Sequence, residues 1–118
     1  LQGDWSSDVC SSDLQEVEQI KADKFPIGNF IGEGEQRFTN HELDLQEGDT
    51  VYLFSDGYAD QFGGPKGKKF RYKNFRDLLI SIQDKPMEEQ NSILDKTIED
   101  WRGNLEQIDD ILVIGIRL

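Results

Sequence analysis

Two short acidic sequences, far apart in the chain, are the residues best suited to chemistry. Ser55-Asp56-Gly57 directly follows a β-branched and aromatic run at residues 50–54, and Asp109-Asp110 directly precedes a second apolar run at residues 111–116. If these runs are neighbouring antiparallel strands, the end of one meets the start of the other, and three carboxylates gather at one sheet edge. Carboxylates crowded in this way take up protons or bind a cation.

An all-oxygen set without Cys or His favours Mg²⁺ or Mn²⁺ over Zn²⁺. Gly57 suits such a site because glycine lets the backbone turn sharply and approach a ligand closely. Taken alone, each acidic sequence is a weak signal, since Ser-Asp-Gly is common in turns and Asp-Asp is common as a solvated cap. Whether the two acidic sequences form one site depends on the strands and helices that position them.

These elements are predicted as strands first and helices afterwards, which indicates an α+β fold. Residues 24–31 and 36–45 are half-apolar and strand-like. The runs at 50–54 and 111–116 lack polar alternation, which predicts buried strands with both faces covered.

Between the two buried strands, the spacing predicts two amphipathic helices. Pro86 is placed to begin the second helix and Gly103 to end it. The apolar stripes consist of Phe75, Leu78, Leu79 and Ile82 in the first helix, and Met87, Leu94, Ile98 and Trp101 in the second.

Length and charge limit the function classes. The chain has 118 residues, which is enough for one domain, and 24 acidic against 13 basic residues give a net charge of −11. Such a charge argues against nucleic acid or an anionic membrane as partner. No apolar run approaches the ~20 residues that a transmembrane helix needs. The single Cys10 cannot form an internal disulfide, which favours a reducing, cytoplasmic location.

Residues 1–14 differ from the rest of the chain. They contain a near-repeat, SSDVC and SSDL, and show neither helical nor strand periodicity. We interpret them as a non-native or artefactual leader, with a genuine flexible linker as the alternative, and assign the domain to residues 15–118.

The segment GDTVYLFSDGYADQFGG, the two helices after it and the terminal EQIDDILVIGIRL together resemble the C-terminal part of the PPM-type phosphatases. These are the metal-dependent serine/threonine phosphatases also called protein phosphatase 2C, and the likeness is to their bacterial SpoIIE-like branch. The resemblance runs from about Ile27 to Leu118. It implies part of an α-β-β-α sandwich, in which two antiparallel sheets are flanked by helices and hold a two-metal centre between them.

By motif position, Asp56 and Asp109 resemble the family's metal ligands, with Gly57 part of the Asp-Gly motif. Asp110 matches the position beside the metal ligand, and Asp60 stands where some members carry an additional metal-site carboxylate; a plain surface acid is the equal alternative. The resemblance implies hydrolysis of phosphoserine or phosphothreonine by a water activated by Mn²⁺ or Mg²⁺.

The family's upstream strand, whose Gly-Asp motif supplies an aspartate that bridges both metals, has no counterpart in residues 1–30. We therefore expect an incomplete catalytic domain that is inactive by itself. A phosphatase-like module that binds a partner without turnover is the alternative. A receiver-type signalling domain is disfavoured, because all its acids follow strands, whereas Asp109 precedes one.

Basic residues are concentrated in residues 66–76, which hold 6 of the 13 and no acid. One interpretation is a solvated loop; the other is a mobile flap, loosened by Gly63, Gly64 and Gly67, that steers a phosphorylated partner toward the metals. The steering residues would be Lys68, Lys69 and Arg71. The resemblance implies a phosphoprotein partner of the anti-sigma-factor antagonist kind and sensor domains upstream.

Overall fold

The computed structural model describes residues 5–10, 17–21, 42 and 44–118. Its main feature is a four-stranded antiparallel sheet in the order β2-β1-β3-β6. The strands are β1 (Trp5–Cys10), β2 (Val17–Lys21), β3 (Thr50–Ser55) and β6 (Val113–Arg117). Because every strand pair in this part of the chain is antiparallel, the sheet differs from the parallel sheet of a receiver domain.

Strand β1 lies inside the segment that we interpreted as a leader. It pairs antiparallel with β2 on one side and with β3 on the other. Residues 1–14 show no strand periodicity, yet residues 5–10 form a strand, because backbone pairing on both sides can hold a strand whose sequence shows no alternation. The non-native origin of these residues stays a prediction. The predicted strands at 24–31 and 36–45 lie mostly outside the described residues.

Both predicted helices are present between β3 and β6. Helix α2 (Tyr72–Ser81) buries Phe75 and Leu79, and helix α3 (Met87–Arg102) buries Leu94 and Ile98. As predicted, Pro86 and Gly103 cap α3 at its two ends, Gly103 with a positive φ of 55°. None of the described helices has the length and apolar character needed to cross a membrane.

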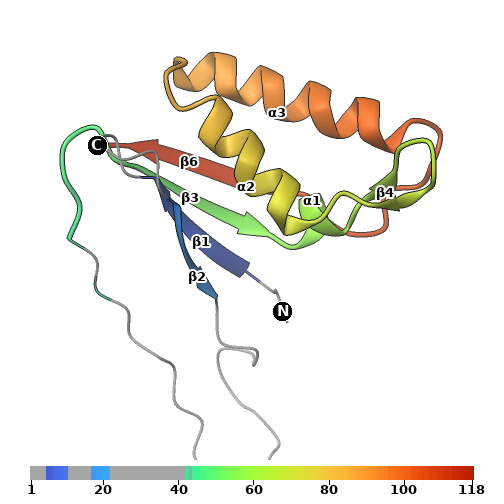
Figure 1. The fold of residues 1–118 in the computed structure, drawn as a ribbon, viewed down its shortest axis with the longest axis horizontal. Coiled ribbons are helices and arrows are strands. Elements are labelled where there is room, and N and C mark those ends of the chain that lie inside the picture. The colour runs from blue at the N-terminus through green and yellow to red at the C-terminus, as the bar shows by residue number, and fades with distance from the viewer. Residues whose placement is uncertain (1–4, 11–16, 22–41, 43) are drawn as a thin grey trace, which may run out of the picture.

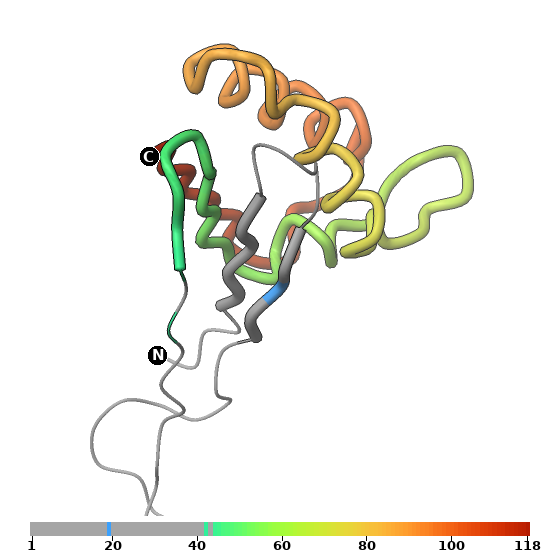
Figure 2. Tube along the Cα trace, turned by 60° about the vertical axis from the view of Figure 1, so that its left-hand side comes forward, coloured from blue at the N-terminus to red at the C-terminus, as the bar shows by residue number. Residues whose placement is uncertain are grey.

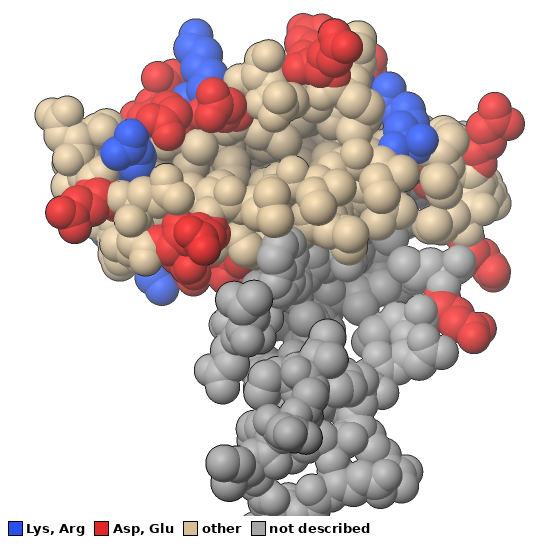
Figure 3. All heavy atoms as spheres, turned by 180° about the vertical axis from the view of Figure 1, so that it is seen from behind, with Lys and Arg blue, Asp and Glu red and all other residues tan. Residues whose placement is uncertain are grey.

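The helices cover one face of the sheet (Figure 1). Tyr52 and Phe54 of β3 point into this core, and the Phe54 ring contacts Phe75 edge-on with 4.8 Å between centroids. The opposite face is open in the described part of the chain, with Leu53 37% and Ile114 43% exposed. The described residues therefore cover one face of β3 and leave open the other face that the pattern predicts to be covered. Seen from behind, the surface shows a broad uncharged band with charged side chains at its margins (Figure 3).

Strand β6 also differs from the predicted buried strand at 111–116. It begins two residues later, lies at the edge of the sheet and is exposed along most of its length. The apolar run that suggested burial reflects a strand with one neighbour and one helix-covered face. A short helix α1 (Gly57–Asp60) and a hairpin of β4 (Phe62–Gly63) and β5 (Lys68–Lys69) connect β3 to α2.

Candidate functional site

The end of β3 and the start of β6 meet through Ser55. Its backbone N–H donates to the Leu112 carbonyl over 3.0 Å, and its hydroxyl donates to the Asp110 carbonyl over 2.7 Å. The Leu112 N–H donates in turn to the Ser55 hydroxyl over 3.1 Å. These hydrogen bonds bring together two segments 55 residues apart in sequence. The strand ends that carry the acidic sequences are therefore neighbours in space. Sequence reasoning did not assign Ser55 this role, although its place directly before the Asp-Gly pair was a signal.

Gly57 is needed where the two segments touch. A Cβ at this position would lie 2.2 Å from the carbonyl oxygen of Asp110. This distance is far below a van der Waals contact, so any side chain would push the backbone of Asp110 away. Gly57 thus permits close approach of two backbones, which is a more specific role than the sharp turn predicted from sequence.

The carboxylates at this edge are accessible. Asp56 is half-buried at the N-cap of α1, and Asp109 and Asp110 are exposed. One carboxylate oxygen of Asp109 accepts a hydrogen bond from the Asp110 N–H over 2.8 Å. Among the described residues, no group of three or more His, Cys, Asp or Glu side chains is arranged to hold a metal ion. The facing of the Asp56 and Asp109 carboxylates therefore stays a prediction.

Asp60 points toward the hairpin instead. Its carboxylate lies 3.6 Å from the ammonium of Lys69, with the side chains 42% and 50% exposed respectively. A surface pair of this kind contributes at most about 1 kcal/mol. The contact favours a surface role for Asp60 over a metal-binding one, and it occupies one of the three predicted steering residues.

The chemistry of the donors fits a hard divalent cation, in part. Asp56 and Asp109 supply carboxylate oxygens, which Mg²⁺ and Mn²⁺ prefer, and their exposure leaves room for water ligands. Two or three carboxylates meet only part of the coordination number of such an ion. The chemistry of these donors thus suits such a cation, but the described residues do not enclose one.

The first part of the basic segment lies in the β4–β5 hairpin, which projects from the body of the molecule (Figure 2), and residues 72–76 form the start of α2. The base of the hairpin is held firmly: the Phe70 N–H donates to the Gln61 carbonyl over 2.9 Å, and the Gly64 N–H donates to the Trp101 carbonyl over 2.8 Å. A Cβ on Gly63 would lie 1.9 Å from that same Trp101 carbonyl oxygen. Gly63 and Gly64 therefore allow close packing against α3, and the prediction that they loosen a flap is wrong.

The tip and the exit of the hairpin differ from its base. Gly67 at the tip has a φ of +60°, and a Cβ added there would meet nothing within 4 Å. Lys68 and Arg71 are exposed. Arg71 has a φ of 78°, a backbone conformation that disfavours any residue with a side chain. Its N–H donates to the Ala59 carbonyl over 2.7 Å, which holds this strained residue beside α1.

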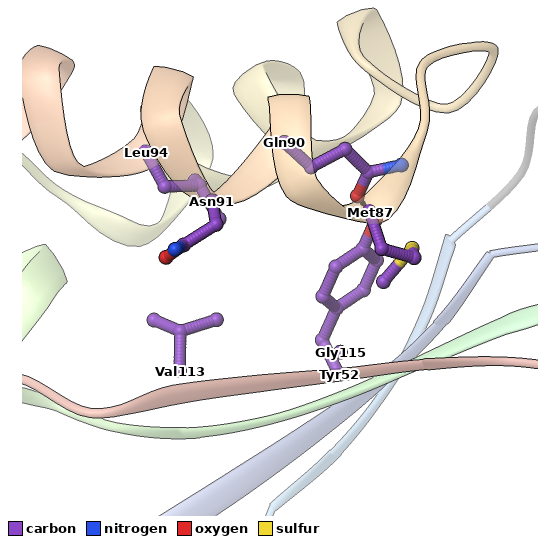
Figure 4. A pocket seen from close by; sticks show the side chains of 7 residues that line it. All are labelled: Tyr52, Met87, Gln90, Asn91, Leu94, Val113 and Gly115. Carbon is purple, nitrogen blue, oxygen red and sulfur yellow. Dashed lines mark hydrogen bonds between the residues drawn. The ribbon is translucent and has the colours of Figure 1, made fainter.

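Two cavities of about 180 and 260 Å³ lie between α3 and β6. In the first, the Tyr52 ring stands on the sheet and its hydroxyl donates to Gln90 of α3 over 2.5 Å (Figure 4). The second is bordered by Tyr58, Asp95 and Ile98. Neither is lined by the acidic residues at the strand ends. Burial, and secondarily the charge of Asp95, raises the pKa of Tyr58.

Comparison with known proteins agrees with the resemblance seen in sequence. Residues 7–118 match the family described as Stage II sporulation protein E (SpoIIE). The SiaA-PP2C domain of Pseudomonas aeruginosa, a solved structure, is 31% identical and superposes with a TM-score of 0.80, covering 98% of this chain and 44% of that one. No curated protein sequence matched. The chain is part of an α-β-β-α sandwich and spans less than half of the solved chain. It belongs to the SpoIIE family of PPM-type, protein phosphatase 2C-like phosphatases.

Proposed function

We propose that this chain contributes part of a catalytic domain that hydrolyses phosphoserine or phosphothreonine on a signalling protein with Mn²⁺ or Mg²⁺. The observation that carries the proposal is the hydrogen-bonded junction of Ser55 with Asp110, which places the Asp-Gly and Asp-Asp sequences side by side. Family membership supports the same reaction class.

Asp56 and Asp109 would hold the cations, with Asp110 beside them. When bound, such cations lower the pKa of a water and neutralise charge on the phosphoryl oxygens. The chain's own residues position the carboxylates: Ser55 joins the two strand ends, and Gly57 allows the Asp110 backbone to approach closely. A protein nucleophile is not needed for direct attack by water.

The proposed substrate is a phosphorylated protein, of the anti-sigma-factor antagonist kind that the family resemblance suggests. A chain of net charge −11 repels a phosphoprotein in general, so a local basic surface would help association. Lys66 and Lys68 are exposed on the hairpin, which follows Asp56 and α1 in the chain. Such a substrate would place the domain in the cytoplasm.

Substitution of the proposed ligands in the full-length protein tests the reaction. Asp56→Asn and Asp109→Asn should each lower Mn²⁺-dependent hydrolysis of a phosphoserine peptide by at least about 100-fold, the upper end of the loss seen for outer partners of a metal. Stability should be unchanged or slightly higher, since each change removes a repulsive charge. Asp100→Asn, on the exposed surface of α3, is the control that should keep full turnover. Unchanged turnover in either ligand variant would refute its role.

A wild-type protein that binds the phosphoprotein but shows no Mn²⁺-dependent turnover would favour the non-catalytic binding module.

Steering by the hairpin is tested separately. Changing both Lys66 and Lys68 to Ser should slow association with the protein substrate at low salt. The control changes both Lys85 and Lys96 to Ser, which removes the same charge outside the hairpin and should not slow association. Hydrolysis of a small aryl phosphate should be equal in both. Equal rates on the protein substrate would return the hairpin to a solvated loop.

A further inference from the structure

A buried glutamine, Gln61, lies where three segments of the chain meet. It follows α1, and its side chain is fully inaccessible to solvent. The side-chain amide donates to the Glu106 carbonyl over 2.9 Å and to the Phe62 carbonyl over 3.0 Å. The first of these hydrogen bonds spans 45 residues and reaches the loop that leads to Asp109.

The backbone carbonyl of Gln61 connects the other two segments. It accepts hydrogen bonds from the Phe70 N–H over 2.9 Å, at the exit of the hairpin, and from the Trp101 indole N–H over 3.0 Å, in the last turn of α3. The Trp101 ring also contacts the Phe70 ring edge-on at 5.5 Å. Gln61 is thus hydrogen-bonded to the hairpin, to the end of α3 and to the following loop.

The loop at residues 103–110 has little packing of its own, since all of its residues are exposed. Two hydrogen bonds tie it to the segment that carries Asp56: one from Gln61 to Glu106, the other from Ser55 to Asp110. Asp109 lies between these two tied positions. The position of Asp109 relative to Asp56 therefore depends on both.

The second amide atom of Gln61 shows what the residue contributes. Its side-chain oxygen is buried and has no hydrogen-bond partner among the described residues. An unpaired buried acceptor is unfavourable for stability, whereas the N–H groups are used fully. An apolar residue of similar size would remove the unpaired acceptor, but it would also leave the Glu106 and Phe62 carbonyls without this donor. The contribution of Gln61 therefore lies in its two N–H groups, one of which holds the loop.

We propose that Gln61 is a positioning residue that sets the metal-binding geometry of Asp109 by holding the 103–110 loop. The inference rests on the proposed function, because it assumes that Asp109 binds a cation. It also makes a separate structural claim, that loss of the Gln61 donors releases the loop whether or not the protein turns over substrate.

Gln90 provides a matched control. It is also a buried glutamine, 2% exposed, and its amide also makes two side-chain hydrogen bonds, accepting from the Tyr52 hydroxyl and donating to the Lys85 carbonyl. However, it lies in the first turn of α3, whereas Gln61 contacts the last turn. The same substitution can therefore be compared near the proposed metal site and away from it.

The test compares Gln61→Met with Gln90→Met in the full-length protein. Hydrogen exchange of the hydrogen-bonded amides of Leu105, Asp110 and Leu112 should become at least about tenfold faster in the Gln61 variant, because the loop has lost one of the two hydrogen bonds that tie it to the segment carrying Asp56. Mn²⁺ binding, followed by electron paramagnetic resonance of the free ion, should weaken by about 10–100-fold, as for other positioning partners of metal ligands. Neither quantity should change in the Gln90 variant.

Trp101→Phe is a milder second variant, useful if Gln61→Met folds poorly. It removes the indole donor to Gln61 and keeps an aromatic ring against Phe70, so it should shift both quantities in the same direction by less. Unchanged exchange in the loop, or faster exchange with unchanged Mn²⁺ affinity, would overturn the proposal. A wild-type protein that does not bind Mn²⁺ would refute the proposed function instead, and the exchange comparison would still decide whether Gln61 holds the loop.

Discussion

Both faces of the β3–β6 pair carry large apolar side chains, but the helices cover only one of these faces. In the register of the pair, Tyr52 is opposite Gly115 and Leu53 is opposite Ile114, and opposed residues share a face. The face of Tyr52 packs under α2 and α3 and leaves that side chain 1% exposed. On the opposite face, three large residues are each 37–47% exposed: Leu53, Ile114 and Ile116.

An apolar face of this kind is unusual on a free surface, since an antiparallel sheet that meets water on one side alternates apolar and polar residues. In the family's α-β-β-α sandwich, a second sheet packs on the face opposite the helices. The composition of β3 and β6 is thus suited to two covered faces, although the described residues cover only one. A buried-strand pattern therefore indicates where a partner layer is required, but it does not identify the residues that form that layer.

The largest expected effect is on the helix-covered face. Phe75→Ala should lower the free energy of unfolding by about 3–5 kcal/mol, because the ring is fully buried and packs against Phe54 and Tyr58 at 4.8 and 4.7 Å. Urea denaturation of this chain measures the change. Ile116→Ala on the open face is the control and should cost less than about 1 kcal/mol. Equal losses would show that the two faces do not differ in this chain.

The second prediction compares one substitution in two contexts. Leu53→Ser should change the stability of this chain by less than about 1 kcal/mol but should cost about 2–4 kcal/mol in the full-length protein, where we expect a second sheet to bury the residue. Denaturation of both proteins, each against its own wild type, tests the difference. A small effect in both would mean that this face stays open in the complete domain.

The helices and the class of the fold were predictable because their signals are local. The stripe from Phe75 to Ile82, the helix start at Pro86 and the helix end at Gly103 depend only on neighbours in sequence. Strand β1 was missed because its pairing with β2 and β3, rather than its own pattern, holds it in place. The pairing of β3 with β6 was inferred conditionally, and the structure contains it.

The acidic residues of the candidate site could be named from the sequence, but the residues that hold their segments in place could not. Asp56 and Asp109 are candidates because of their motif positions. No nearby sequence pattern identifies Gln61 or Trp101, since their contacts join segments about 40 residues apart. The two hairpin glycines were read as flexible because glycine is permissive by itself. Only the position of the Trp101 carbonyl shows that Gly63 is required for packing.

The third prediction concerns that contact, which joins the hairpin to the helix layer. Gly63→Ala should destabilise the chain by about 1–3 kcal/mol, because the added Cβ would lie 1.9 Å from a backbone oxygen that cannot turn away. Gly115→Ala is a suitable comparison: the atom nearest its Cβ position is the flexible end of Met87, at 2.7 Å, so the cost should be smaller. Thermal unfolding of the two variants ranks them. A costlier change at Gly115 would contradict the assigned contact.

The smallest expected effect is a pH dependence confined to the helix-covered side. Tyr58 is 2% exposed and its hydroxyl donates to the Leu94 carbonyl over 2.7 Å. Burial first, and the charge of Asp95 second, raises its pKa above the ordinary value of about 10. The folded state therefore retains the proton that the unfolded state loses. The stability that Tyr58 contributes is complete below pH ~10 and falls as the pH rises through the folded pKa.

Tyr58→Phe should thus cost about 1 kcal/mol at neutral pH, the value of one hydrogen bond, and less as the pH rises from 9 to 11. The measurement is the difference in unfolding free energy between wild type and variant across this range, which cancels the titration of all other groups. Asp95→Asn removes the second cause of the shift, so its alkaline loss of stability should be shallower than that of wild type. A difference between wild type and Tyr58→Phe that stays constant with pH would show that the hydroxyl is not held neutral by burial under α3.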